Sequence, residues 1–185
     1  MLVVLDACVL YPASMRDLLL TLAALDAFDV AWTDEILEEV QRNVVADHPD
    51  IDPDRFASHT LGAMRAAFPQ AAVTGYEHLI ADLDNDPKDR HVAAAAIAAG
   101  ASAIVTENVR DFQSSMLQAA GIEVLTAGDL VFSLLDTEPG VVVSALEHLS
   151  RRWTAPARTI TEILDLLTVH PTMGTAVERL RDLTD

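Results

Sequence analysis

Short apolar runs alternate with longer segments of helical periodicity through the first 135 residues, and this alternation restricts the fold more than any other feature of the sequence. The apolar runs predict strands at residues 2–5, 30–32, 103–106 and 122–125. The segments between them predict helices at residues 14–27, 34–45, 53–67, 87–99, 114–120 and 128–135. Strands separated by helices of this length form right-handed crossover units. We therefore predict an α/β fold with a central parallel sheet and helices on both faces, a three-layer α/β/α arrangement.

The sequence changes character after residue 135. Residues 136–140 read DTEPG, a helix-breaking combination, and the later segments carry apolar residues at helical spacing, separated by TAPA and HPTMG. We predict a sheet-containing domain at residues 1–135 and an all-helical C-terminal extension at residues 136–185.

The composition excludes several classes of protein. With 51% hydrophobic residues the chain is globular rather than disordered. No uncharged apolar stretch of about 18 residues is present, so we expect neither a membrane span nor a signal peptide, and the expected compartment is the cytoplasm. A single cysteine, Cys8, excludes an internal disulfide framework.

The formal net charge of −17 gives no overall basic footprint of the kind that nucleic-acid-binding proteins usually carry. The acidic groups either form a solvated surface that favours solubility, or some of them are concentrated to hold divalent cations that meet a phosphate backbone. A basic protein partner would also neutralise such a surface.

Asp6 directly follows the first apolar run. Burying an unpaired carboxylate costs several kcal/mol, so Asp6 either lies at the open end of a strand or pairs with a cation. Ligands of parallel sheets bind at the carboxyl ends of the strands. Asp6 is therefore expected to lie near the residues that follow Thr106, among them Glu107, Asn108 and Asp111.

Two predicted helices also offer carboxylates. The acids at the amino end of the helix at 34–45 complement the helix dipole, but Glu39 lies deeper, beside the buried stripe. In the helix predicted at residues 87–99, Asp86 is a natural N-cap and Pro87 suits the first helical position. Asp89 opens a helix apolar enough to be buried and is a candidate ligand, whereas His91 is interpreted as a structural histidine.

The carboxylates from these separate segments define a candidate metal site. Oxygen ligands without clustered histidine or cysteine suit a hard cation, Mg²⁺ or Mn²⁺. Such an ion activates water toward phosphorus, so phosphoester hydrolysis is the expected reaction. The four candidate ligands are Asp6, Glu39, Asp89 and Asp111.

Four stretches, in this order, resemble those of PIN-domain ribonucleases, and most closely the VapC-like toxins of bacterial toxin–antitoxin pairs. They are LDACVLYPASMRDLLL, WTDEILEEVQRN, DPKDRHVAAAA and IVTENVRDF. The resemblance covers residues 1–135 and implies a PIN-like fold there; the helical remainder resembles the C-terminal extension of some VapC-like proteins. By this resemblance Asp6, Glu39 and Asp89 match the acidic metal ligands of the family.

The fourth acidic position and position 8 depart from the family pattern. The family places Asp or Asn two residues after the threonine, which here gives Asn108 after Thr106. We expect Asp111 to supply the charge, while Asn108 and Thr106 take part in binding the cofactor as neutral groups. Cys8 stands where the family more often has Asn or Ser, and a thiol is a poor substitute for their hydrogen bonds.

The resemblance also implies an activity and partners. It implies hydrolysis of RNA to 5′-phosphate and 3′-hydroxyl products with Mg²⁺ or Mn²⁺ as cofactor. It further implies a homodimer, and inhibition by a cognate antitoxin protein whose segment crosses the acidic groove and offers an arginine to the carboxylates.

Three alternatives stay open. A haloacid-dehalogenase-type phosphohydrolase would use Asp6 as a nucleophile, but it normally has a second aspartate where Cys8 stands, and Lys88 is the only lysine. A PIN-like module that binds RNA or a protein without cutting is kept open by Asn108 and Cys8. The basic sequence SRRW, with Arg158, is either a solvated helix end or a grip for RNA or the antitoxin.

Overall fold

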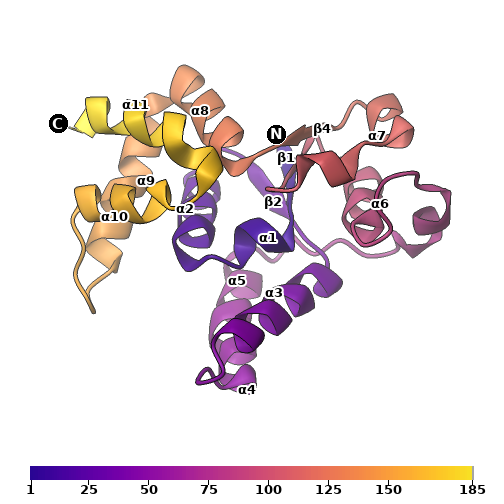
Figure 1. The fold of residues 1–185 in the computed structure, drawn as a ribbon, viewed down its shortest axis with the longest axis horizontal. Coiled ribbons are helices and arrows are strands. Elements are labelled where there is room, and N and C mark those ends of the chain that lie inside the picture. Colours follow the sequence, from indigo (N-terminus) through magenta and orange to yellow (C-terminus); the bar gives the residue numbers. More distant parts are fainter. Residues whose placement is uncertain (185) are drawn as a thin grey trace.

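Four parallel strands lie at the centre of the molecule in the order β2-β1-β3-β4 (Figure 1). The structure is a computed structural model and describes residues 1–184. The strands are β1 (Leu2–Leu5), β2 (Asp29–Ala31), β3 (Ala103–Val105) and β4 (Glu123–Leu125). Val4 pairs with Ala31 on one side and with Ile104 on the other, so β1 and β3 are the inner strands. The predicted α/β fold with a parallel sheet is confirmed.

The strand ends differ from the prediction by one residue. β2 begins and ends one residue early. It ends at Ala31 because the Trp32 backbone is bonded elsewhere: its N–H donates to the Ala71 carbonyl at 2.9 Å, and its carbonyl accepts from the Val73 N–H at 2.8 Å. β3 ends at Val105, and β4 begins one residue late.

Helices fill the connections between the strands and form the C-terminal region. They are α1 (Ala7–Leu10), α2 (Ala13–Ala24), α3 (Asp34–Asp47), α4 (Pro53–Phe56), α5 (Gly62–Ala67), α6 (Arg90–Ala99), α7 (Ser115–Ala119), α8 (Ala127–Thr137), α9 (Pro139–Arg152), α10 (Ile160–Thr168) and α11 (Gly174–Thr184). Shorter turns are η1 (Ala57–Leu61, a π-helix), η2 (Glu77–Asp82), η3 (Val109–Phe112) and η4 (Pro171–Met173). Within residues 1–184, none of these helices is both long and apolar enough to cross a membrane.

The predicted start of the helix at residue 87 is wrong. The Asp86 carboxylate accepts from the Lys88 N–H at 3.0 Å and the Asp86 carbonyl accepts from the Asp89 N–H at 3.0 Å, which closes a turn before the helix. Helix α6 therefore begins at Arg90, and Asp89 instead of Asp86 occupies the N-cap position, without a side-chain capping bond. This leaves the Asp89 carboxylate uncommitted to the helix end.

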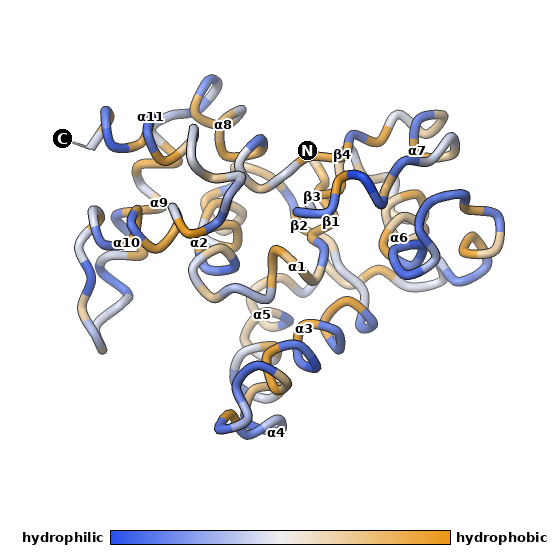
Figure 2. Tube along the Cα trace, in the orientation of Figure 1, coloured by the Kyte–Doolittle hydropathy of each residue, from blue (hydrophilic) through white to orange (hydrophobic). Residues whose placement is uncertain are grey.

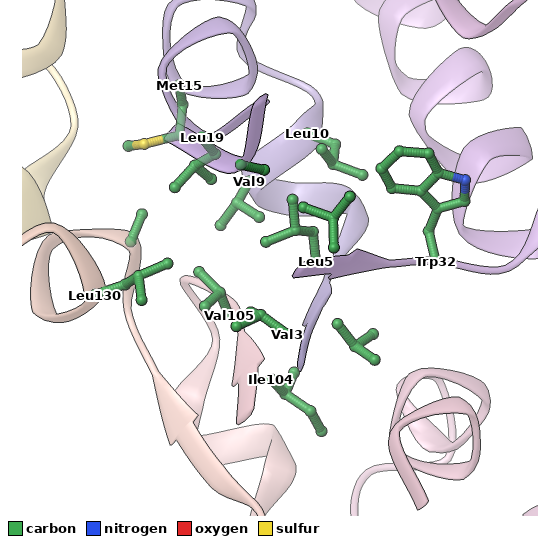
Figure 3. Close-up of a cluster of buried hydrophobic side chains, with 14 of the residues drawn as sticks. Val3, Leu5, Val9, Leu10, Met15, Leu19, Trp32, Ile104, Val105 and Leu130 are labelled. Carbon is green, nitrogen blue, oxygen red and sulfur yellow. The ribbon is translucent and has the colours of Figure 1, made fainter. Parts of the chain in front are cut away.

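Helical layers cover both faces of the sheet. Figure 1 shows α6 to one side of the strands and α2, with α8 to α11, to the other, and α6 packs on β1 and β3 while α2 packs on β2. Side chains from β1, β3, α1, α2 and α8 meet in one buried cluster (Figure 3). Helix α3 alternates between apolar and polar residues along its length (Figure 2), as expected when one side of a helix is buried.

The C-terminal region is helical, as predicted, and packs closely on the rest of the chain. Helix α9 contacts α2 and α8, and α11 contacts α8 and α10. Gly128 in α8 allows η4 to approach, because a Cβ at this position would lie 1.8 Å from the Thr172 carbonyl oxygen. The backbone of η4 is thereby seated directly on the start of α8.

Candidate active site

Asp6 lies at the carboxyl end of β1 and is only 4% exposed. Its N–H continues the sheet ladder to the Val105 carbonyl at 3.0 Å. Its carboxylate accepts from the Ala7 N–H at 2.6 Å and from the Thr106 hydroxyl at 2.7 Å. Within residues 1–184 no lysine or arginine forms an ion pair with it. Neutral donors therefore satisfy the buried carboxylate oxygens of Asp6.

The Cys8 thiol takes part in the same network. It donates to Asp6 at 3.0 Å, accepts from the Glu107 N–H at 3.2 Å, and lies 3.3 Å from the Thr106 hydroxyl. Burial, and next the Asp6 charge, raise the pKa of Cys8 to about 12, so the group stays a thiol that can donate. A cysteine at this position thus joins α1 to the turn after β3.

Asp89 has a raised pKa. Partial burial is the largest cause that raises its pKa to about 6. The negative charges of Asp6 and Asp111 are the next causes, followed by that of Asp86, and His91 acts in the opposite direction. Backbone hydrogen bonds join the turn that carries Asp89 to the turn that carries Asp111, and Asp6 directly follows β1. These three predicted site residues therefore lie toward the same edge of the sheet.

Glu39 approaches this edge from α3, beside His91. Its Oε2 lies 3.7 Å from the His91 Nε2. The other ring nitrogen, Nδ1, lies 2.8 Å from the Lys88 carbonyl oxygen and must donate its proton to that acceptor. His91 is 8% exposed, and its Nε2 has no hydrogen-bond partner among residues 1–184. The imidazole is held by the turn before α6 while its second nitrogen points toward the Glu39 carboxylate.

The turn after β3 is tied to the loop before α6. The Thr106 hydroxyl accepts from the Asn108 N–H at 3.1 Å, and the Asp111 N–H donates to the Asn108 carbonyl at 2.9 Å. The Asp111 carbonyl accepts from the Asp86 N–H at 3.0 Å, which joins the two segments. The side chains of Asn108 and Asp111 are exposed at this junction.

The donor set suits a hard divalent cation, since its polar atoms are carboxylate, hydroxyl and amide oxygens. A cation would also relieve the repulsion that raises the pKa of Asp89. In the described part of the chain, however, no three His, Cys, Asp or Glu side chains form a ready-made metal-binding group. An ion bound here would have to draw the carboxylates closer together.

Glu107 was not predicted as a site residue. Its carboxylate accepts from the Thr172 hydroxyl, with oxygen–oxygen distances of 2.8 and 3.0 Å, and from the Ala127 N–H at 3.4 Å. Its place directly after Thr106 was visible in the sequence. No pattern in the sequence marked Thr172, 65 residues later, as its partner.

Residues 2–110 match the PIN domain family, and the chain belongs to that family. The matched range contains Asp6, Glu39, Asp89 and Asn108 and ends one residue before Asp111.

The chain is also similar to a VapC protein. It is 33% identical over 93 residues to a protein of Mycobacterium tuberculosis (strain ATCC 25618 / H37Rv) that carries the name "Putative ribonuclease VapC50". The alignment covers 50% of this chain and 55% of that protein, so the chain spans about half the length of its relative. No solved structure matches the chain.

Proposed function

We propose that this protein is a ribonuclease that hydrolyses RNA phosphodiester bonds with Mg²⁺ or Mn²⁺ and serves as the toxin of a toxin–antitoxin pair. The main support is the position of Asp6 in a PIN-domain chain: it follows β1 at the carboxyl edge of the sheet, with its carboxylate held by the Ala7 N–H and the Thr106 hydroxyl. The similarity to the VapC protein supports the same assignment.

In this proposal Asp6, Asp89, Asp111 and Glu39 hold the cation. When bound, the ion supplies a water of lowered pKa and neutralises charge on the scissile phosphate. Asp6 is fixed for this role by the hydrogen bonds from Ala7 and Thr106.

The groups beside the carboxylates orient the substrate. Thr106 holds both the Asp6 carboxylate and the Asn108 backbone, so one hydroxyl sets the spacing between β1 and the turn after β3. The exposed Asn108 amide offers a donor and an acceptor to the phosphate of the substrate. The products are an RNA end with a 5′-phosphate and one with a 3′-hydroxyl.

The proposal includes partners and organisation. We propose a catalytic domain at residues 1–135, a helical extension at residues 136–185, a homodimer in the cytoplasm, and an antitoxin that inhibits the enzyme. An arginine of the antitoxin would neutralise the repelling carboxylates in place of the metal, which explains how a peptide can compete with the cofactor.

Cleavage of total RNA in Mg²⁺ tests the proposal. The Asp6→Asn variant should lose activity, and EDTA should abolish it. The matched control is Asp29→Asn, since Asp29 is an exposed aspartate at the opposite, amino-terminal edge of the sheet. Equal activity of Asp6→Asn and wild type, or activity that persists in EDTA, would refute the proposal.

A second candidate function is a PIN-like module that binds RNA or a protein without cutting it. The observation in its favour is that the described residues form no ready-made group of three metal ligands. The same assay separates the two functions, because a binding module retains RNA or its partner in Mg²⁺ but releases no shortened products.

A further inference from the structure

Two adjoining cavities lie on the side of α2 that faces the C-terminal helices. The first, of about 600 Å³, lies between α2, the helical stretch at residues 57–67 and α9. The second, also of about 600 Å³, is bounded by the start of α2 and by residues 152–158. Asp17 and Arg152 line both cavities, so the two adjoin; together they are called the basic trough.

The charge of the basic trough is opposite to that of the whole chain. The chain has 12 Lys and Arg against 29 Asp and Glu. The trough is lined by three arginines, two histidines and a single acidic residue, Asp17. The Asp17 carboxylate is engaged, since the Trp153 indole N–H donates to it at 2.9 Å. A positive depression on a protein of charge −17 is a place where an anion is expected to bind.

Two of the arginines are available to a ligand. Arg152 is exposed and Arg158 is half-buried, and within residues 1–184 neither side chain has an ion pair or a hydrogen bond. The neighbouring Arg151, which does not line the trough, pairs with Glu147 at 3.5 Å. Unpaired guanidinium groups beside a depression can donate paired hydrogen bonds to the oxygens of a phosphate group.

The third arginine, Arg16, contributes positive charge but is held in place by backbone hydrogen bonds. Arg16 is buried and donates to the Leu10 and Tyr11 carbonyls at 2.9 and 3.3 Å. Its pKa is lowered by burial, raised by Asp17 and lowered again by Arg152, which places the Arg152 charge close to it. Two like charges on neighbouring helices are unfavourable in the free protein, and a bound anion would relieve this repulsion.

Aromatic surfaces accompany the positive charge. Trp153 is half-buried in the wall of the second cavity, and its hydrogen bond to Asp17 fixes the orientation of the indole ring. Phe68, also half-buried, lines the first cavity. Aromatic rings beside arginines are the combination with which proteins bind single-stranded nucleic acid, because bases stack on the rings while the cations contact the backbone.

The trough is linked to the candidate active site through a short series of contacts. Ser14 lines the second cavity, and its hydroxyl lies 3.1 Å from the His170 Nε2. Two residues after His170, Thr172 donates to Glu107, which directly precedes Asn108 in the turn after β3. The wall of the trough is therefore connected, through Ser14 and the segment 170–172, to the turn after β3.

We propose that the basic trough binds the phosphate backbone of single-stranded RNA through Arg152 and Arg158, outside the carboxylate site, with Trp153 as a stacking surface. This inference rests on the proposed ribonuclease function. It explains how a strongly acidic chain would hold a polyanion. An acidic peptide also carries anionic groups, but it offers no flat bases to the rings, so RNA is the occupant that the lining favours.

Binding of a fluorescent single-stranded RNA oligomer in EDTA, where metal-dependent cleavage is blocked, tests the trough. The Arg152→Gln/Arg158→Gln variant should raise the dissociation constant by about tenfold and reduce the slope of log K against log salt by ~0.7 for each lost phosphate contact. Arg151→Gln, on the same helix but outside the lining, should remain within about twofold of wild type. Thermal melting checks that each variant folds, and the single variant at the exposed Arg152 replaces the double variant if needed.

The outcomes separate the trough from the proposed function. If wild type binds RNA through these arginines but releases no cleavage products in Mg²⁺, the ribonuclease proposal fails and the trough stands. If wild type cleaves RNA while the double variant keeps the wild-type KM and dissociation constant, the trough is refuted. A polyglutamate peptide that binds wild type as tightly as RNA does, through the same arginines, would overturn the assignment to RNA.

Discussion

Thr172, in the C-terminal helical region, donates a hydrogen bond to Glu107, in the turn after β3, and the two oxygens lie 2.8 Å apart. Glu107 is the neighbour of Thr106, which holds the Asp6 carboxylate. The C-terminal region is therefore connected to the candidate active site through the Glu107 side chain in the turn after β3.

Replacing Thr172 by valine, which keeps the shape but removes the donor, should destabilise the protein by about 1–2 kcal/mol and lower RNA cleavage, because the Glu107 carboxylate loses its hydroxyl partner. Urea unfolding and initial cleavage rates measure the two effects. Thr184→Val is the control, since that hydroxyl bonds only within its own helix. A loss of activity equal to that of the control would show that the contact does not position the turn.

Replacing Gly128 by alanine should cost about 1–3 kcal/mol, because the new Cβ would lie 1.8 Å from the Thr172 carbonyl oxygen and η4 would have to move away. Gly140→Ala is the matched control: a Cβ there meets nothing within 4 Å, and alanine favours a helix. The midpoints of urea unfolding should fall for the first variant and stay equal or rise for the second. The reverse order would mean that η4 does not rest on α8.

The hydrogen bonds of Asp84 predict how the stability of the protein changes in acid. Its carboxylate accepts from the Ser114 hydroxyl at 2.5 Å and from the Ser115 hydroxyl and N–H, and these bonds lower its pKa to about 2. A lowered pKa contributes stability above the unfolded value of about 4, and this stability is lost as the pH falls toward 2. Asp84→Asn should therefore lose less stability than wild type between these pH values. Parallel pH profiles of the two proteins would contradict the assignment.

Asp89 should respond to substitution in two opposite ways. Because its raised pKa means that the charged form is disfavoured, Asp89→Asn should melt at a higher temperature than wild type in EDTA at neutral pH. Mg²⁺ should stabilise wild type more than the variant. At a metal concentration tenfold above its dissociation constant, the free energy of unfolding of wild type should rise by about 1.4 kcal/mol, and that of the variant should rise by less. Thermal melts with and without Mg²⁺ measure both. An equal Mg²⁺ response in the two proteins would remove Asp89 from the proposed metal site.

The sheet could be predicted because buried parallel strands leave a clear signal. Runs such as residues 2–5 are continuously apolar, and the helices between them have the right length for crossovers. The position of Asp6 at the end of β1 followed from the cost of burying a carboxylate. The hydrogen-bond partners of Asp6 could not be predicted in this way, because they are neutral groups, and one of them, Thr106, lies 100 residues later in the sequence.

Other features were missed for local reasons. Asp86 and Pro87 look like the start of a helix, but the Asp86 carboxylate closes a turn with Lys88 instead and moves the start to Arg90. Helix α1 is only four residues long and left no periodic signal. The contact between Glu107 and Thr172 depends on how the C-terminal helices pack, which no single stretch of the sequence encodes. The roles of the site residues stay predictions.

Cleavage of RNA in water enriched in ¹⁸O tests the central claim most directly, because a water that attacks phosphorus leaves its oxygen on the product. The account predicts 5′-phosphate ends that carry one ¹⁸O, formed by wild type and by Asp29→Asn in Mg²⁺ but not by Asp6→Asn. Products with a 2′,3′-cyclic phosphate, or labelled ends formed equally well by Asp6→Asn, would contradict it.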